Sequence, residues 1–226
     1  MSEAPPSGAA TAKRLILPFA IAVVLAGLAM WQGRLSVGVV CFLFMALCSL
    51  TIRVLITDAT PLPVVRTIGG QREAILIQFV GAGMMYLPAI MIATLLLDFA
   101  GYEPSAVMLG VGVALAAFGL WLFWRSHTDL GTYWSPTLEL REGHQLVTRG
   151  VYARLRHPMY AALFVITAAQ ACFLGNWIAG PAGIIALGLL YLLRIDDEER
   201  MMGEAFGAEW SAYAGRTGRL LPSARK

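Results

Sequence analysis

The sequence predicts an all-α protein: a polytopic transmembrane helix bundle of about six spans, with a cytoplasmic cofactor loop and a C-terminal helical tail. Of its 226 residues, 58% are hydrophobic and 14% are charged, whereas about 25% of an average soluble domain is charged. Six stretches approach the ~20 apolar residues that cross a bilayer. The basic residues gather in alternate loops, a pattern that is typical of membrane topology.

The composition also excludes several classes of protein. A soluble domain of 226 residues could not hide this much apolar surface in one core. The net charge of +3 is too small for a nucleic-acid-binding protein. Cys41, Cys48 and Cys172 are scattered in apolar runs without a CxxC pair, which argues against a disulfide framework and a thiolate metal site. We therefore expect membrane lipids as neighbours, and neither nucleic acid nor metal as a partner.

The predicted spans, in chain order, are residues 15–31, 35–56, 74–97, 106–124, 159–174 and 177–193. The first is longer than the ~7–15-residue core of a signal peptide, so we interpret it as a retained span after a disordered N-terminus of residues 1–14. Gly175 and Asn176 separate the last two spans, and such a pair is typical of a turn. These spans are expected to form an antiparallel hairpin, with Gly180 and Pro181 in the first turn of its second helix. A bundle of five spans is the alternative.

The charge distribution predicts the orientation. If the N-terminus is cytoplasmic, 16 of the 17 basic residues fall on the cytoplasmic side, and only Arg34 falls on the other. Cytoplasmic loops carry the excess of Lys and Arg, so we predict an integral membrane protein with both termini in the cytoplasm. In a bacterium this would be the inner, cytoplasmic membrane. Spans one to four contain no acid and only Arg53 as a base, which argues against an ion pathway.

Residues 15–124 are thus four predicted transmembrane helices, and residues 125–226 are the predicted catalytic part. This part comprises a cytoplasmic loop (125–158), the helical hairpin (159–193) and a cytoplasmic tail (194–226). The common nucleotide and hydrolase motifs are absent: there is no P-loop, HExxH or GxSxG. The GxG at Gly110 lies inside a span, so it is not a dinucleotide fingerprint. Any chemistry must therefore come from the loop and the tail.

Two features of these segments carry chemical information. His144 and His157 lie in the loop, and the tail opens with four consecutive acids, Asp196 to Glu199. For His157 the structural alternative is a basic residue in the headgroup layer beside a helix-starting proline, and for His144 it is a solvated loop residue. Anionic headgroups would repel the acids, so we expect a cationic partner or local pairing with Arg154, Arg156 or Arg200. A continued helix would place Arg194 and Glu198 one turn apart.

In their order and spacing, the motifs of the C-terminal half resemble the isoprenylcysteine carboxyl methyltransferase family. The matching elements are Gly143-His-Gln-Leu-Val-Thr148, Gly150-Val-Tyr152, Arg156-His-Pro-Met-Tyr160, Arg194 with Glu198-Glu199, Phe206-Gly207 and Trp210-Ser-Ala-Tyr213. Arg-His-Pro-x-Tyr alone is less specific, because phospholipid methyltransferases and membrane sterol reductases are similar there. The resemblance covers residues 134–222, and the first four spans carry no diagnostic motif.

The resemblance implies a membrane-embedded methyltransferase that uses S-adenosylmethionine without a Rossmann domain. By similarity, Arg194 would face the methyl acceptor. The residues expected to bind the cofactor are His144, Gln145, Leu146, Val147, Tyr152, His157, Pro158, Met159, Tyr160 and Glu198. Gln145 and Met159 stand at variable positions, so they are expected to act through their backbone. The acceptor would be lipophilic and would enter from the bilayer.

Four hypotheses for the function stay open at this point. The first is a carboxyl methyltransferase that acts on a lipidated acid of the isoprenylcysteine type. The second is a methyltransferase of the same architecture that acts on a phospholipid amine or a small thiol; an amine must lose a proton, so Glu198 or Glu199 would then act as a base. The third is a nicotinamide-dependent membrane reductase, and the fourth is a non-catalytic membrane protein.

Overall fold

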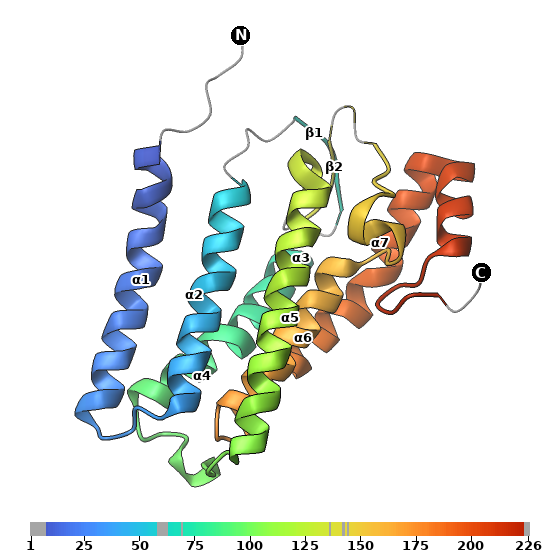
Figure 1. Ribbon diagram of the computed structural model, residues 1–226. Helices are drawn as coiled ribbons and strands as arrows, with labels where there is room; N and C mark the ends of the chain where they lie inside the picture. Colours follow the sequence, from blue (N-terminus) through green and yellow to red (C-terminus); the bar gives the residue numbers. More distant parts are fainter. Residues whose placement is uncertain are drawn as a thin grey trace.

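The structure is a computed structural model that describes residues 8–57, 63–68, 70–135, 137–141, 143 and 145–223 (Figure 1). Its α-helices are α1 (Gly8–Trp31), α2 (Val37–Thr57), α3 (Gly70–Gly81), α4 (Leu87–Ala93), α5 (Ala106–Leu130), α6 (Pro158–Phe173) and α7 (Ala182–Arg216). Strands β1 (Val64–Ile68) and β2 (Leu138–Arg141) form a small ribbon at one end of the bundle. The predicted helical membrane fold is confirmed, and the ribbon is an addition to it.

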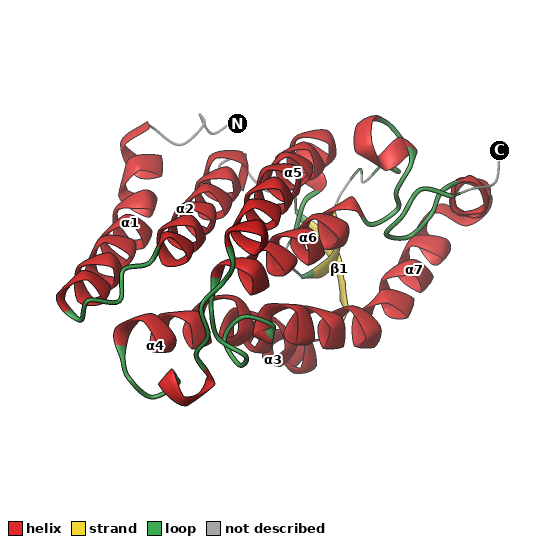
Figure 2. Ribbon diagram, turned by 60° about the horizontal axis from the view of Figure 1, so that its bottom comes forward, coloured by secondary structure: helices red, strands yellow, loops and turns green. Residues whose placement is uncertain are grey.

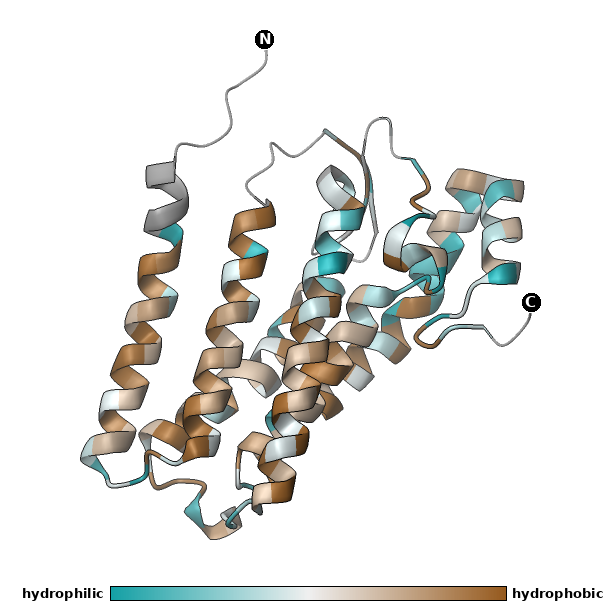
Figure 3. Cartoon of the chain, viewed as in Figure 1, coloured by the Kyte–Doolittle hydropathy of each residue, from teal (hydrophilic) through white to brown (hydrophobic). Residues whose placement is uncertain are grey.

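Four helices in the described part of the chain are long and apolar enough to cross a membrane. They are α1, α2, the composite helix of residues 70–93 and α5, and α6 is a shorter apolar helix of 16 residues. The first half of α7 is apolar, and its second half is polar (Figure 3). α1 begins at Gly8, inside the stretch for which the sequence predicted disorder; residues 1–7 lie outside the described residues.

The third span differs from its prediction. It ends at Ala93 instead of residue 97, and a π-helical segment, η1 (Ala82–Tyr86), interrupts it between α3 and α4. π-Helical turns often mark functional sites. Gly83 in this segment packs so closely on α7 that an added Cβ would lie 2.5 Å from the carbonyl oxygen of Ala182. The π-helical segment thus packs closely against the start of α7 at Gly83.

The hairpin of the last two spans is also built differently. α7 begins at Ala182, so Gly180 and Pro181 precede the helix instead of lying in its first turn. The connection therefore spans residues 174–181 and not only Gly175 and Asn176. Asn176 is buried and organises this connection, since its side chain accepts from the N–H groups of Ile178 and Ala179 and donates to Leu97 O at 2.7 Å.

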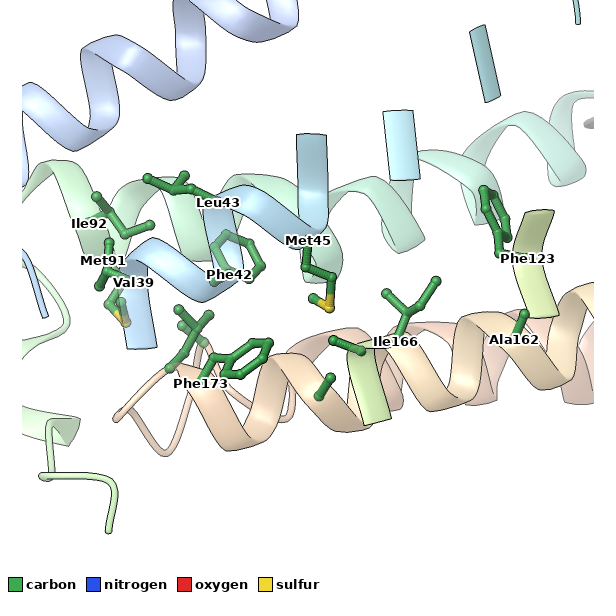
Figure 4. Packing of buried hydrophobic residues seen from close by; sticks show 14 of the residues in the cluster. Val39, Phe42, Leu43, Met45, Met91, Ile92, Phe123, Ala162, Ile166 and Phe173 are labelled. Carbon is green, nitrogen blue, oxygen red and sulfur yellow. The ribbon is translucent and has the colours of Figure 1, made fainter. Parts of the chain in front are cut away.

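The helices are arranged around α6. α1, α2 and α5 stand side by side, and α3, α4 and α7 lie on the opposite side (Figure 2). Apolar side chains fill the space between the two groups, and Figure 4 shows Phe42 of α2 close to Phe173 of α6. Glycines let α5 approach α6 closely: a Cβ on Gly119 would lie 2.9 Å from Ile166. In this packing α6 contacts α2 and α5 on one side and α7 on the other, and α1 contacts α4 directly.

The ribbon and the tail close one end of the bundle. α5 extends to Leu130, so Arg125 lies in a helix and not in the predicted loop. β1, which precedes α3, pairs antiparallel with β2 of the loop. α7 continues as a helix to Arg216 with a break at Gly207, whose φ of 53° suits glycine. The chain then turns back, and Gly218 forms an isolated bridge with Leu155.

Candidate active site

A cavity of about 420 Å³ opens at the end of the bundle that carries the ribbon. It extends along α6 from Pro158 to Gln170, a helical distance of roughly 18 Å. Its inner part is apolar, and its outer part is polar. The inner lining includes Phe42, Met45, Met84, Leu163, Ile166 and Leu187, and the outer lining includes Arg53, His127, Glu139, His157, Arg194 and Glu198.

The structure brings most of the predicted site residues into this cavity. Nine of the eleven line it: Leu146, Val147, Tyr152, His157, Pro158, Met159, Tyr160, Arg194 and Glu198. Gln145 is exposed and is not among the lining residues. His144 lies outside the described residues, so its expected cofactor contact stays a prediction. Residues as far apart as Leu146 and Glu198, 52 positions along the chain, thus line one cavity.

His157 lies between two carboxylates. Its Nδ1 is 3.6 Å from Glu198 Oε1, and its Nε2 is 3.2 Å from Glu199 Oε1. The residue is 5% exposed. The alternative interpretation of His157, as a basic residue that faces the lipid headgroups, is therefore wrong. Burial alone would lower the pKa of the imidazole, but the two carboxylates outweigh it and raise the pKa above its ordinary value. The imidazolium can then donate to Glu199 at 3.2 Å, and its charge faces the carboxylate of Glu198.

Glu199 is the centre of a structural cluster. Arg156 Nε donates to its Oε1 at 3.0 Å, and Arg219 Nη2 donates to its Oε2 at 2.6 Å. Burial opposes ionisation, but His157 and the arginines outweigh it and lower the pKa of Glu199 to about 2. Arg156 also donates to the carbonyl oxygens of Ala214 and Thr217. Glu199 therefore joins the end of the tail to the start of α6.

The other acids of the tail pair with arginines, as the sequence predicted for some of these pairs. Arg200 pairs with Asp197, and Arg72 of α3 approaches the same carboxylate at 3.5 Å. Arg219 reaches Asp196 at 3.2 Å. Arg154 is exposed and, within the described chain, pairs with none of the four acids. The pairing with Arg156 and Arg200 is confirmed, and that with Arg154 is wrong.

Arg194 and Glu198 lie one turn apart on α7, as predicted, with Arg194 Nε 3.7 Å from Glu198 Oε2. Tyr160 donates its hydroxyl to the same Oε2 at 3.0 Å. Burial raises the pKa of Glu198, but its contacts with His157, Arg194 and Tyr160 outweigh this, so the net shift is downward. Both side chains are largely enclosed, so the pair is not a solvated surface pair. Glu198 is held as a carboxylate at the cavity wall.

Tyr152 is a structural support as well as a lining residue. Its hydroxyl donates to Ser126 O of α5 at 3.3 Å, and burial raises the pKa of its phenol. Tyr213 of the tail donates to the carbonyl oxygens of Tyr152 and Leu155. Burial also raises the pKa of Tyr213, to about 12. The tail thus fixes the short helical turn that precedes α6.

Sequence reasoning missed several residues that line the cavity or contact its lining residues. Glu73 of α3 contacts Arg194, and His127 of α5 is fully buried, with its Nδ1 donating to Phe123 O at 2.9 Å. Trp134 lies beside His127 and under Arg53, and its Nε1 is 3.1 Å from Met159 Sδ. These residues belong to no sequence motif. The signals that the sequence offered were a histidine on an apolar helix and an acid at the boundary of a span.

We predict that stability depends on the protonation of His157. Because the folded state raises the pKa of His157, protonation of this residue stabilises the fold. The stabilisation is complete below the pKa of the unfolded state, about 6.5, and it is lost as the pH rises through the pKa of the folded state. The denaturation temperature in detergent should therefore fall above pH 6.5, by about 2–4 °C if ~1 kcal/mol is lost. The His157→Gln variant should lack this dependence. An identical pH profile for both proteins would contradict the assignment.

The fold and the cavity together define a class: a polytopic helical membrane protein with a charged and aromatic site at one end of the bundle and an apolar pocket behind it. Within this class, residues 111–204 match the model of the Isoprenylcysteine carboxyl methyltransferase (ICMT) family. The resemblance predicted from the sequence is confirmed. The match contains all eleven predicted site residues and excludes α1 to α4.

Curated relatives agree over the same region. The chain is 32% identical over 81 residues to protein-S-isoprenylcysteine O-methyltransferase B of Arabidopsis thaliana, covering 36% of this chain and 41% of the relative. It is 34% identical over 84 residues to the Tribolium castaneum protein-S-isoprenylcysteine O-methyltransferase, covering 37% and 30%. The human enzyme of that name is 33% identical over 84 residues, 37% of this chain and 30% of the relative. The matched part spans less than half of each relative.

The likeness of the fold extends further than that of the sequence. The structure of the eukaryotic intramembrane Ras methyltransferase ICMT superposes with a TM-score of 0.52 at 18% sequence identity. The superposition covers 91% of this chain and 75% of the other. At this identity the likeness concerns the fold alone, and it includes the N-terminal helices that the sequence matches leave out.

Proposed function

We propose that the protein transfers the methyl group of S-adenosylmethionine to the carboxylate of a membrane-partitioned acceptor of the isoprenylcysteine type. One observation carries the proposal: a cavity that extends roughly 18 Å along α6 joins an arginine, a carboxylate and aromatic side chains to an apolar inner part. An acceptor with an acidic head and an apolar chain matches both parts. The similarity of residues 111–204 to the carboxyl methyltransferase family supports the same chemistry.

The outer part of the cavity fits the proposed methyl donor. When bound, S-adenosylmethionine supplies an electrophilic methyl group on a sulfonium sulfur. Glu198 is held as a carboxylate by Tyr160 and His157, so it can accept from the ammonium or the ribose hydroxyls. Leu146, Val147 and Met159 line the wall beside it, and their backbone groups can receive the remaining polar atoms. Tyr160 and Trp134 offer aromatic faces to the adenine or to the cation.

Arg194 would hold the acceptor. A carboxylate is ionised at neutral pH, so its methylation needs no general base. The guanidinium can bind both carboxylate oxygens in one plane. The apolar side chains of α2, η1 and α6 would hold the chain of the acceptor. Since displacement requires alignment of the reacting atoms at ~3–3.5 Å, this fixed placement would supply much of the rate, and the enclosed site would keep water away.

Two ligand titrations separate the classes of function. Detergent-purified protein is titrated with S-adenosylmethionine and, separately, with NADPH. We expect saturable binding of the former only. The purified protein should then transfer a labelled methyl group to an N-acylated S-prenylcysteine, but not to its preformed methyl ester. Binding of NADPH alone would favour the reductase, and transfer only to phospholipid amines or thiols would favour the second methyltransferase hypothesis.

We infer that the cofactor enters from the cytoplasm and the acceptor from the bilayer, with both termini in the cytoplasm. The site, the ribbon and the start of α1 lie at the same end of the bundle (Figure 1). A Gln145→Cys variant should react with an impermeant thiol reagent from the cytoplasmic side of oriented vesicles. Glu103→Cys, just before α5 at the opposite end, should react from the other side. The reverse pattern would contradict this orientation.

A further inference from the structure

Glu73 contacts the proposed acceptor-binding arginine from outside the family match. It lies in the first turn of α3, and its Oε1 is 3.0 Å from Arg194 Nη1. The residue is 4% exposed, and the Arg194 side chain is 11% exposed. The matched region begins at residue 111. An acid from the N-terminal half of the chain therefore contacts an arginine of the cavity wall.

The guanidinium of Arg194 lies between two carboxylates on different helices. Glu73 meets Nη1 at 3.0 Å, and Glu198 approaches Nε at 3.7 Å. The former distance is within hydrogen-bonding range, and the latter is beyond it. Of these two contacts, the one from α3 therefore holds the guanidinium more closely. The place of Glu73 in the first turn also suits a carboxylate, because the helix dipole favours negative charge there.

We propose that Glu73 is a positioning residue, which orients the guanidinium of Arg194 so that its planar fork meets the acceptor carboxylate. The proposal rests on the proposed function. An arginine side chain has many rotamers, and one that is oriented before the acceptor arrives loses less entropy on binding. Glu73 does this from a separate helix, so Arg194 keeps one orienting contact when the methyl donor engages Glu198, as proposed.

A competing role for Glu73 makes the opposite prediction. If Glu73 only occupied the guanidinium until the acceptor displaced it, removing its charge would tighten acceptor binding and leave turnover unchanged. A positioning residue, when neutralised, lowers turnover because the acceptor binds in a wrong orientation. The division of the effect between kcat and KM thus separates the two roles.

Arg72 provides a matched control. It is the neighbour of Glu73 on α3 and contacts the same stretch of α7, donating to Leu193 O at 2.8 Å and lying 3.5 Å from Asp197. Its side chain is 58% exposed, whereas Glu73 is buried and contacts Arg194. Neither residue is among those that line the cavity. If the contact between α3 and α7 mattered only for stability, Arg72→Gln and Glu73→Gln would act alike.

The test compares Glu73→Gln, Glu73→Asp, Arg72→Gln, Arg194→Lys and the double variant Glu73→Gln/Arg194→Lys in purified protein with the carboxylate acceptor. Glu73→Gln should lower kcat 10-fold or more, with the dissociation constant of S-adenosylmethionine within twofold of wild type. Glu73→Asp should recover part of the loss, and Arg72→Gln should stay within twofold. The double variant should be no slower than Arg194→Lys, because residues that act through one another are not additive.

Three results would overturn the proposal: a kcat unchanged by Glu73→Gln, a lower acceptor KM with unchanged kcat, or losses that multiply in the double variant. If Glu73→Gln does not fold, Glu73→Asp and its combination with Arg194→Lys give the same comparison. Absence of transfer by the wild-type protein would instead refute the proposed function, so the two failures are distinguishable.

Discussion

Replacing Arg194 by lysine is expected to lower the single-turnover rate of carboxyl methylation by about 100-fold at saturating cofactor, the loss typical of a misplaced reactant. The dissociation constant of S-adenosylmethionine should change less than twofold. Lysine keeps the positive charge but has no planar fork, so it cannot align both acceptor oxygens. It also cannot meet Glu73 and Glu198 in the geometry that orients the guanidinium.

The same variant distinguishes the acceptor classes. If the acceptor is an amine or a thiol, Arg194 has no carboxylate to hold, and lysine should nearly replace it. A rate within about twofold of wild type corresponds to a barrier change of only ~0.4 kcal/mol. That result would refute carboxyl methylation while leaving methyl transfer intact. Rapid mixing with labelled cofactor, with protein in excess over acceptor, measures the rate directly.

Glu198→Gln is expected to weaken binding of S-adenosylmethionine by ~1.5–3 kcal/mol, or roughly 10–150-fold in the dissociation constant. The amide keeps the size of the side chain but loses the charge that would meet the ammonium or ribose. It also loses the charge that faces His157 and Arg194. Calorimetric or fluorescence titration of the purified protein gives the affinity, and a parallel melting curve reports any loss of stability.

Asp197→Asn is the control for this substitution. Asp197 is the adjacent acid, but it pairs with Arg200 and Arg72 and does not line the cavity. Its neutralisation should leave cofactor affinity within twofold. Equal weakening by both substitutions would mean that the overall charge of the cluster, and not a contact with Glu198, attracts the cofactor. If Glu198→Gln binds S-adenosylmethionine as tightly as the wild type, the cofactor contact is made by another residue.

The sequence predicted the features that depend on local pattern. Apolar runs of sufficient length predict spans whatever their neighbours, and the spacing of Arg194 and Glu198 follows from the helical repeat. The family resemblance placed Tyr152, His157 and Tyr160 in one site with Arg194 and Glu198, and all five residues line the cavity. These predictions needed no knowledge of which helices touch.

The remaining features depend on contacts between distant segments. Glu73 and Arg194 are 121 positions apart, and nothing in either local sequence points to the other. β1 and β2 are short strands that follow no long alternating pattern, so their pairing is decided by the proximity that the bundle imposes. The start of α7 at Ala182 likewise reflects the buried Asn176, whose hydrogen bonds organise the connection.

The ribbon of β1 and β2 has a consequence for exchanging parts between relatives. Arg66 lies opposite Leu140, and Thr67 lies opposite Glu139, a cavity residue. Arg66 also pairs with Glu204 near the end of α7 at 2.8 Å. A chimera that transplants only residues 111–204 would therefore separate one strand from its partner and Arg194 from Glu73. A transferable unit must also include residues 64–73 and the tail as far as Arg219, which holds Glu199. The boundary of the working module therefore does not coincide with the boundary of detectable similarity.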